Sequence, residues 1–479
     1  MSTYCNPLPL PNYPRGRYAD GSHDAQYDGW RSGVRRDFRE TADPSVIYDD
    51  GRYILYSSAG MAWTSDDGGA TWQHRPVEPY DIGYAPTVVK HGGRYLLTAC
   101  HASVWASDDP LGPFEELGPI RGVHGGELEP AAKFYDPMLF SDDDGRLYVY
   151  WGLADDGIKG VQLDADDPTQ AVSERAVMFA YDPAHVWERF GEFNEDASKS
   201  FVEGPWMLKA AGRYYLTYTA PGTEFASYGM GAYVADAPLG PFRYQSHNPI
   251  CESRHGLIRG AGHGCVIHGH HDRLWAFFTC GAQTAHNFER RVGMAPARID
   301  EQGELRVGPV SERPMPIAPG NRAAGGDKTA GLVPVNRAKA VSASSIATGR
   351  EPAYANDGDL RTWWQPTSGS GGRAVLTTSF NGRFRVSAAR LAWAEPGLDY
   401  AAGRTPEPVP FTLELCDGEP SADVSWRVVA DNRGGDELLI DYRTFEPTDA
   451  TAARVVVHGS PGYAWGIADV TVFGVESAG

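Results

Sequence analysis

The sequence predicts an all-β chain, and three observations support this prediction. The 479 residues include 56 glycines and 35 prolines, and 11% of the side chains are aromatic, a composition typical of turn-rich β proteins. A short motif, a polar turn followed by an aromatic and aliphatic run, recurs five times in the first three hundred residues. Alternating apolar strands without a helical period follow from residue 335 to residue 479. These features predict a five-bladed β-propeller followed by a β-sandwich of the jelly-roll type.

The repeated motif has an arginine where each strand begins. Each run after the arginine is rich in Tyr, Leu, Val and Phe, and it follows the kind of tight turn that joins antiparallel strands. Successive arginines are separated by 42, 52, 67 and 60 residues, which matches a four-stranded blade with insertions. The five arginines, and hence the five predicted blades, are at Arg52, Arg94, Arg146, Arg213 and Arg273.

A second apolar strand begins nine or ten residues before each arginine, at Asp43, Ala85, Asp136, Glu203 and His263. We predict that these are the innermost strands and that the arginine strands are second in each blade. Equivalent positions on innermost strands face one axial funnel, so three carboxylates and a histidine should converge there. Convergent carboxylates repel each other, which separates their pKa values and lets one act as an acid while another acts as a base.

A purely structural interpretation of the same residues is also open. Asp-Pro and Glu-Gly-Pro are common turn sequences at strand starts, because Asp bonds its own backbone and proline fixes φ. Trp206, three residues after Glu203, is either a core residue or the aromatic platform of a sugar pocket. The recurrence of three carboxylates in phase favours the functional interpretation.

Charge and hydropathy exclude several classes of protein. The formal net charge is −19, whereas nucleic-acid and anionic-membrane binders present basic surfaces. The sequence contains no run of 18 apolar residues, and its start lacks a signal-peptide pattern, so we expect a cytoplasmic protein without a membrane segment. Six scattered cysteines without CxxC spacing predict reduced, mostly buried thiols. The oligomeric state is not indicated.

Five segments together resemble glycoside hydrolase family 43, the five-bladed propeller glycosidases. The resemblance covers about residues 5–310 and rests on TADPSVI, FYDPMLF, FVEGPWM, GAGHGCV and ERRVGMAPARID. It implies that Asp43 is the general base that activates water and that Glu203 is the general acid. It also implies that Asp136 raises the pKa of the acid and orients it.

The resemblance extends to residues that bind the sugar. His263 matches the axial histidine of the family, beside which a water or a calcium ion often lies. One of Arg290 and Arg291 matches an arginine that contacts the substrate, and the sequence leaves open which. Tyr84 stands where the family frequently has a tryptophan, so the sugar platform is expected to differ.

The activity implied by this resemblance is exo-acting, inverting hydrolysis of terminal pentose or furanose sugars from an oligosaccharide substrate, with no cofactor required for the chemistry. An α-L-arabinofuranosidase or a β-xylosidase comes first, and a β-galactofuranosidase is an alternative. A non-catalytic carbohydrate-binding propeller is a further alternative, in which the carboxylates only bond sugar hydroxyls. A binding protein could lose any one of the three carboxylates without penalty, so the intact set favours an enzyme.

The chain divides into a propeller at residues 1–318, a Gly/Pro/Ala-rich linker at 319–334 and a sandwich at 335–479. The second domain resembles the discoidin-like, coagulation factor 5/8 type C domains that also serve as carbohydrate-binding modules. Asp357 and Asp359 are candidate ligands for a structural calcium ion, which some relatives of that type hold. We expect this domain to be dispensable for the chemistry. Its resemblance rests on residues 336–345, 354–364 and 463–474.

Overall fold

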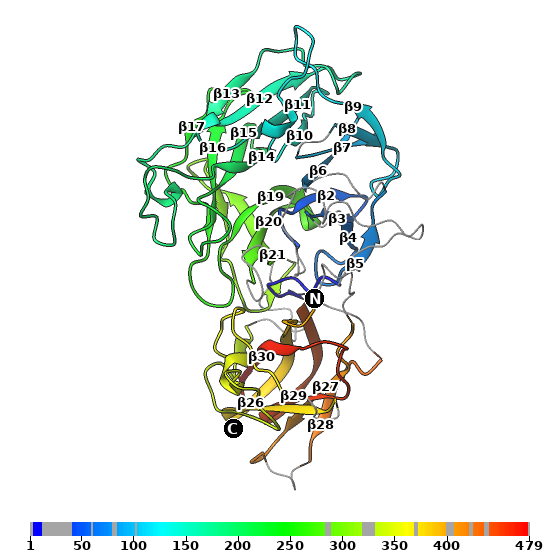
Figure 1. The fold of residues 1–479 in the computed structure, drawn as a ribbon, viewed down its shortest axis with the longest axis vertical. Coiled ribbons are helices and arrows are strands. Elements are labelled where there is room, and N and C mark those ends of the chain that lie inside the picture. Colours follow the sequence, from blue (N-terminus) through cyan, green and yellow to red (C-terminus); the bar gives the residue numbers. More distant parts are fainter. Residues whose placement is uncertain are drawn as a thin grey trace.

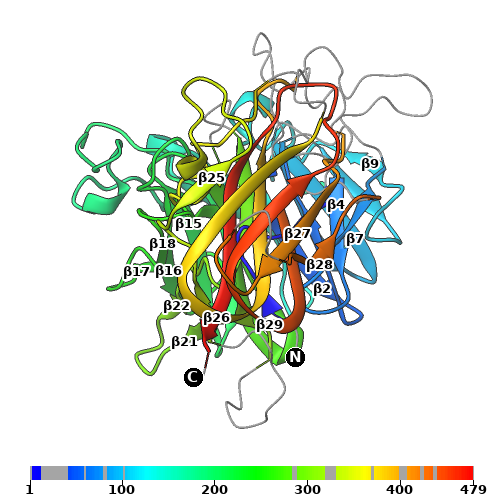
Figure 2. The same cartoon turned by 90° about the horizontal axis from the view of Figure 1, so that it is seen from below.

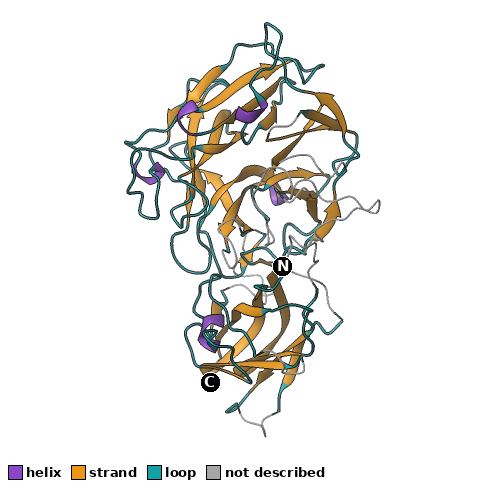
Figure 3. Cartoon of the chain, in the orientation of Figure 1, coloured by secondary structure: helices purple, strands orange, loops and turns teal. Residues whose placement is uncertain are grey.

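The computed structural model has two β domains that follow one another along the long axis of the molecule (Figure 1). Within the described ranges, the helices are 3-10 turns of three or four residues set in loops (Figure 3), and no helix is long and apolar enough to cross a bilayer. These turns are Ala131–Lys133, Ala154–Asp156, Val186–Glu188, His270–Asp272 and Pro352–Ala355. The prediction of an all-β chain is confirmed. The structure describes residues 3–11, 41–58, 61–78, 84–100, 103–282, 289–318, 331–367, 372–398, 407–420, 425–434 and 440–477.

The first domain is a propeller of five antiparallel blades, each with its strands in chain order. The first blade comprises β2 (Ser45–Asp49), β3 (Arg52–Tyr56), β4 (Met61–Ser65) and β5 (Gln73–Pro76). The second comprises β6 (Tyr84–His91), β7 (Arg94–Cys100), β8 (Val104–Ser107) and β9 (Glu115–Gly118). The third comprises β10 (Met138–Ser141), β11 (Leu147–Gly152), β12 (Ile158–Leu163) and β13 (Ala176–Phe179).

The fourth and fifth blades complete the ring. The fourth comprises β14 (Glu203–Ala210), β15 (Arg213–Ala220), β16 (Gly229–Ala235) and β17 (Arg243–Tyr244), with β18 (Cys251–Glu252) also paired to β16. The fifth comprises β19 (Gly262–Gly269), β20 (Arg273–Gly281), β21 (Arg290–Ile299) and β22 (Leu305–Val307). A separate short pair joins β1 (Thr3–Tyr4) to β23 (Met315–Pro316).

Each inner strand contacts the inner strand of the next blade, in the order β2, β6, β10, β14 and β19. A contact between β19 and β2 closes the ring. The strands that follow the repeated arginines are β3, β7, β11, β15 and β20, the second strand of every blade. Both placements confirm the prediction from the repeat. Aromatic side chains fill the blades, and Trp63, Trp151 and Trp275 are fully buried. All six cysteines are free and buried, as expected.

The second domain is one continuous antiparallel sheet in the order β24-β30-β26-β29-β27-β28, with β25 paired to β26. Its longest strand, β26, has register shifts between Ser379 and Phe384 and between Val386 and Ala388, and such bulges bend a strand. The sheet therefore curves around its own apolar core (Figure 2). The strands are β24 (Val333–Pro334), β25 (Val341–Ala343), β26 (Ala374–Ala394), β27 (Phe411–Cys416), β28 (Arg427–Asp431), β29 (Ile440–Val457) and β30 (Gly466–Glu476).

The sheet of the second domain begins within the linker predicted at 319–334. β24 pairs with β30, so the sheet begins at Val333, two residues before the predicted start at residue 335. Residues 319–330 of the predicted linker lie outside the described residues.

The N-terminal segment lies at the junction of the two domains (Figure 1). The Asn6 side chain donates a 2.9 Å hydrogen bond to the Met294 carbonyl of the fifth blade and accepts one of 2.9 Å from the Met294 N–H. From the second domain, the fully buried Arg390 donates to the carbonyl oxygens of Asn6 and Glu312, both at 2.7 Å, and pairs with Asp469 at 3.1 Å. A buried guanidinium is costly unless it is fully paired. This network therefore favours a single arrangement of the two domains.

Candidate active site

The backbone has an unusual conformation at the axial end of the inner strands. Asp43, Ala85 and Asp136 have positive φ angles of 52°, 49° and 46°, and a proline follows each of them. Residues in sparsely populated conformations cost about 1–3 kcal/mol each and cluster at functional sites. In the fourth blade the left-handed position is Gly204, whose φ is 59°. A Cβ on Gly204 would lie 2.7 Å from His263 Cδ2, so glycine lets the chain pass close to that ring.

Glu203 therefore lies one residue before the position that Asp43 and Asp136 occupy. The predicted common phase is wrong by one residue in this blade. Gly204 is the residue that precedes the proline in this blade, and it lies nine positions before Arg213, as Ala85 lies nine before Arg94. Glu203 thus corresponds to Tyr84 of the second blade, and the register shift that follows it is shared by both blades. Bulges re-aim side chains, and the Glu203 carboxyl group still comes close enough to interact electrostatically with Asp136, His263 and Asp43.

Asp43 is a buried carboxylate with three hydrogen-bonding neighbours. Arg290 donates from Nη1 to Oδ1 at 3.0 Å and from Nη2 to Oδ2 at 3.1 Å. Ser58 Oγ donates to Oδ2 at 2.6 Å, and His263 Nδ1 lies 3.1 Å from Oδ1. Burial alone would raise the pKa of Asp43, but the charges of Arg290 and His263 outweigh it and hold the pKa well below its ordinary value. Asp43 is therefore ionised at neutral pH.

Glu203 has the opposite environment. Burial, followed by the negative charge of Asp136, raises the pKa of Glu203 to about 8. The Tyr228 hydroxyl donates to Glu203 Oε1 at 3.2 Å. Among the described residues, this is the one hydrogen bond seen to the Glu203 carboxyl group. Glu203 therefore keeps its proton at neutral pH.

Asp136 and His263 lie between these two groups. His263 Nδ1 is 3.7 Å from Asp136 Oδ2 as well as 3.1 Å from Asp43 Oδ1. Burial lowers the pKa of His263, but the two carboxylates outweigh it and raise the pKa to about 9. The Cys100 thiol donates to Asp136 Oδ1 at 3.1 Å and accepts the Asp136 N–H at 3.1 Å. Asp136 is thus held by a thiol on one side and faces an imidazolium on the other.

We call Asp43, Asp136, Glu203, His263 and Arg290 the axial cluster. One of its carboxyl groups is ionised and another is protonated at the same pH, because their surroundings push the two pKa values apart. This division is what general acid and base catalysis requires of paired carboxyl groups. Hydrolysis of a glycosidic bond is one reaction that uses such a pair of carboxyl groups.

Comparison with known proteins decides the family. Residues 38–305, more than half of the chain, match the family model "Glycosyl hydrolases family 43". The chain belongs to glycosyl hydrolases family 43.

Curated relatives of this family 43 hydrolase are distant. A "Beta-xylosidase" of Xylanibacter ruminicola is 28% identical over 226 residues, which are 41% of this chain and 63% of the relative. A "Beta-D-galactofuranosidase xynD" of Aspergillus niger is 30% identical over 158 residues (33% of this chain, 40% of the relative), and a "Xylosidase/arabinosidase" of Bacteroides ovatus is 28% identical over 189 residues (33% and 53%). The chain thus spans 40–63% of the length of these relatives.

A solved structure has the same fold. A thermostable family-43 glycoside hydrolase aligns with a TM-score of 0.50 and 21% identity, over 66% of this chain and 98% of that one.

The two candidate arginines of the family 43 hydrolase face different ways. Arg290 reaches Asp43, and it also donates to the Tyr84 hydroxyl and, at 3.3 Å, to Thr223 Oγ1. Arg291 is the next residue on β21 and donates instead to the Arg290 carbonyl at 2.9 Å and to Glu289 at 3.3 Å. Neighbouring strand residues point to opposite faces, so the structure brings Arg290 and Tyr84 into the site and leaves Arg291 outside it.

Trp206 does not join the axial cluster, and its assignment as a sugar platform is corrected. Its side chain is 7% exposed, packs in the main hydrophobic core, and donates from Nε1 to the Val266 carbonyl at 2.9 Å. The bulge after Glu203 separates the two residues, and the indole completes the wall between the fourth and fifth blades.

A set of small polar residues that was not predicted from the sequence joins neighbouring blades at four of the five junctions. They stand six positions after the repeated arginines, where the second strands end, and they accept hydrogen bonds of 2.8–3.1 Å from the backbone N–H groups of axial residues. The shared spacing from the arginines is the signal that could have found them. The pairs are Ser58 with Ala85, Cys100 with Asp136, Thr219 with His263, and Thr279 with Asp43.

The residues around His263 do not fit a calcium ion. Calcium takes six to eight oxygen ligands, whereas His263 presents a nitrogen that is protonated and paired with two carboxylates. Asp359 pairs with Arg361, and Asp357 accepts from Thr362. In the part of the chain that the structure describes, no group of three or more His, Cys, Asp or Glu side chains is arranged to hold a metal.

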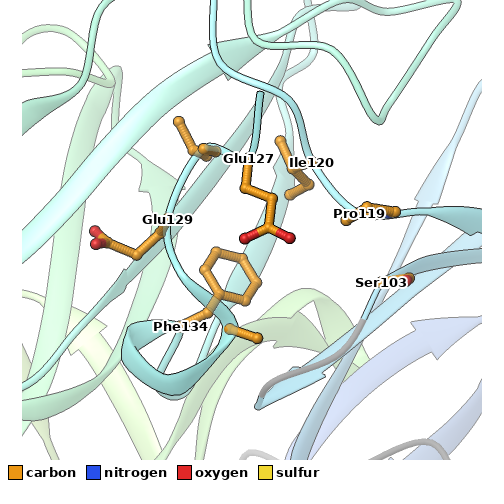
Figure 4. Close-up of a pocket in the computed structure, with 8 residues that line it drawn as sticks. Ser103, Pro119, Ile120, Glu127, Glu129 and Phe134 are labelled. Atoms are coloured by element: carbon orange, nitrogen blue, oxygen red, sulfur yellow. The ribbon is translucent and has the colours of Figure 1, made fainter. Parts of the chain in front are cut away.

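A small cavity of about 70 Å³ lies apart from the axial cluster, between the second and third blades (Figure 4). Glu127, Ile120 and Phe134 are among the residues that line it. None of the predicted site residues contributes to it, and its volume holds little more than a few water molecules.

Proposed function

We propose that this family 43 hydrolase is an exo-acting, inverting enzyme that releases terminal pentose or furanose sugars from oligosaccharides. An α-L-arabinofuranoside or a β-xyloside is the first candidate substrate. The observation that carries this proposal is the contrast between Asp43, ionised by Arg290 and His263, and Glu203, kept protonated by burial and Asp136. The names of the Xylanibacter and Bacteroides relatives support the sugar class.

In this mechanism Glu203 gives its proton to the oxygen of the leaving group as the glycosidic bond breaks. Asp43 takes a proton from the water that attacks the opposite face of the sugar, which inverts the anomeric carbon. Asp136 is assigned the role of keeping Glu203 protonated and oriented. A proton from solvent must then return to Glu203, and Asp43 must release its own, before the next turnover.

Arg290 is proposed to contact a sugar hydroxyl, with Tyr84 and His263 beside it. In the ligand-free arrangement, both Arg290 nitrogens that face Asp43 are hydrogen bonded to it. A guanidinium that turns toward a sugar hydroxyl would relax this pairing and raise the pKa of Asp43. Substrate binding would thereby make Asp43 a stronger base at the moment when water must be activated.

A β-galactofuranosidase is the second candidate, because the Aspergillus relative carries that name. The second domain is proposed to be a discoidin-like carbohydrate-binding module. This part of the proposal rests on the sequence motifs and on the β-sheet of residues 333–476, which has an apolar core.

The test is a panel of p-nitrophenyl α-L-arabinofuranoside, β-xyloside and β-galactofuranoside, assayed with wild type and the Asp43→Asn variant. We expect release from one pentoside or furanoside, lost by about 10²–10⁴-fold in the variant. Proton NMR of the first-formed sugar should show the inverted anomer. Near-normal turnover by Asp43→Asn, or retention of configuration, would refute the mechanism.

A further inference from the structure

The connection between β13 and β14, residues 180–202, ends next to Glu203 and exposes apolar side chains. Three large apolar side chains in it are open to solvent: Val186 (56% exposed), Phe193 (84%) and Phe201 (38%). Of the three, Phe201 is closest in sequence to the acid Glu203.

Phe201 shares a face with Glu203. The Phe201 N–H donates to the Pro221 carbonyl at 2.8 Å, and Glu203 pairs with Thr219, so residues 201–203 continue the ladder of β14 with β15. Side chains alternate along such a ladder. Val202, between the two, points into the core and is fully buried. Phe201 therefore stands on the same side as the acid, two residues away.

Two other phenylalanines support the Phe201 ring. The Phe190 ring centroid lies 5.8 Å from that of Phe201 and 4.7 Å from that of Phe225, both edge to face. Lys199 Nζ lies 3.8 Å from the centroid of Phe190. Edge-to-face contacts of this kind fix ring orientation and stabilise the cluster.

The phenylalanine cluster includes a residue of the loop that carries two hydrogen-bonding partners of the axial cluster. Phe225 lies between β15 and β16, on the loop that carries Thr223, the 3.3 Å partner of Arg290, and Tyr228, the 3.2 Å partner of Glu203. The three rings are thus tied to the axial cluster at both ends. One tie is the backbone of residues 201–203, and the other is this loop.

We propose that Phe201, backed by Phe190 and Phe225, is the platform on which the leaving sugar stacks. This inference rests on the proposed function, in which Glu203 protonates the oxygen of the leaving group. The leaving sugar must then lie on the Glu203 side, where Phe201 presents an exposed ring. Sugars offer an apolar C–H face that packs on aromatic side chains lining a pocket. The platform that the sequence suggested at Trp206 is thereby assigned to a different residue.

The test compares substrates with and without a leaving sugar. Wild type and Phe201→Ala are assayed on β-1,4-xylobiose and β-D-xylosyl fluoride, or on 1,5-α-L-arabinobiose and α-L-arabinofuranosyl fluoride if arabinosides are preferred. Fluoride carries no sugar for the platform to hold. We expect kcat/KM on the disaccharide to fall about tenfold, mainly through KM, and kcat/KM on the fluoride to change less than twofold.

Two further variants make the result specific. Phe193→Ala removes a more exposed ring from the same connection and is expected to leave both substrates unchanged. Phe201→Trp keeps an aromatic face and is expected to retain most of the disaccharide activity. Equal losses on disaccharide and fluoride in Phe201→Ala, or no loss on the disaccharide, would overturn the platform. A wild-type enzyme inactive on every sugar would instead overturn the proposed function, and the platform with it.

Discussion

The Asp136→Asn variant tests whether Asp136 keeps the acid protonated. In the proposed mechanism Glu203 must carry a proton to act, so activity should be lost as the pH rises through its pKa of about 8. The negative charge of Asp136 is the second cause of that raised pKa, after burial. Asparagine keeps the size of the side chain and removes the charge. The pKa of Glu203 must then fall, and the alkaline limb of the pH profile must move to lower pH.

The size of the expected loss of activity follows from the position of the alkaline limb of the pH profile. A single nearby charge shifts a pKa by about one unit or more. At pH 8 the wild-type acid is about half protonated, and after a shift of about one unit it would be about one-tenth protonated. At pH 6 both forms are almost fully protonated. The loss of activity in Asp136→Asn should therefore be about fivefold larger at pH 8 than at pH 6, on top of any loss that is independent of pH.

The assay is kcat/KM on an unactivated disaccharide between pH 5 and pH 10, because kcat/KM reports the free enzyme. Cys100→Ser is the matched control, since it keeps a hydrogen-bond donor to Asp136 and leaves the charge in place. Its alkaline limb should stay at the wild-type position. A limb that does not move in Asp136→Asn would show that Asp136 does not set the proton affinity of Glu203.

Three further results are expected. Glu203→Gln should lose about 10²–10⁴-fold on disaccharides and much less on a dinitrophenyl glycoside, whose leaving group needs little protonation; equal losses would argue against Glu203 as the acid. Arg290→Ala should reduce kcat/KM by at least tenfold, whereas Arg291→Ala should change it far less. Steady-state kinetics of both variants measure this, and a larger loss in Arg291→Ala would show that the assignment of Arg290 is wrong. Arg390→Ala should remove the closer of the two guanidinium partners of the buried Asp469, while Arg337 stays 3.6 Å away, and should cost up to about 3–5 kcal/mol of stability, measured by denaturant unfolding; an unchanged midpoint would contradict the bridging role of Arg390.

The repeat was visible in the sequence because it is local. An arginine and a strand start nine or ten residues earlier lie within one hairpin, so their spacing predicts both the blades and the axial position of Asp43 and Asp136. The offset of Glu203 could have been found by aligning the prolines, because Pro205 follows Gly204, whereas prolines directly follow Asp43 and Asp136. Burial of Trp206 and exposure of Phe201 depend on how neighbouring blades pack. The bond from Arg390 to the Asn6 carbonyl joins residues 384 positions apart, which no local pattern reports.

The bonds between neighbouring blades also bear on when during synthesis activity would appear. Asp43 is made early, but its N–H is held by Thr279 and its carboxylate by Arg290, both in the fifth blade. A nascent chain that has folded four blades therefore has Asp43 without the partners that ionise and orient it. Asp43, the first of the proposed catalytic groups to be synthesised, acquires these partners only when the fifth blade has folded. Hydrolytic activity is thus expected to report that the propeller has closed, and unfinished chains should be inert.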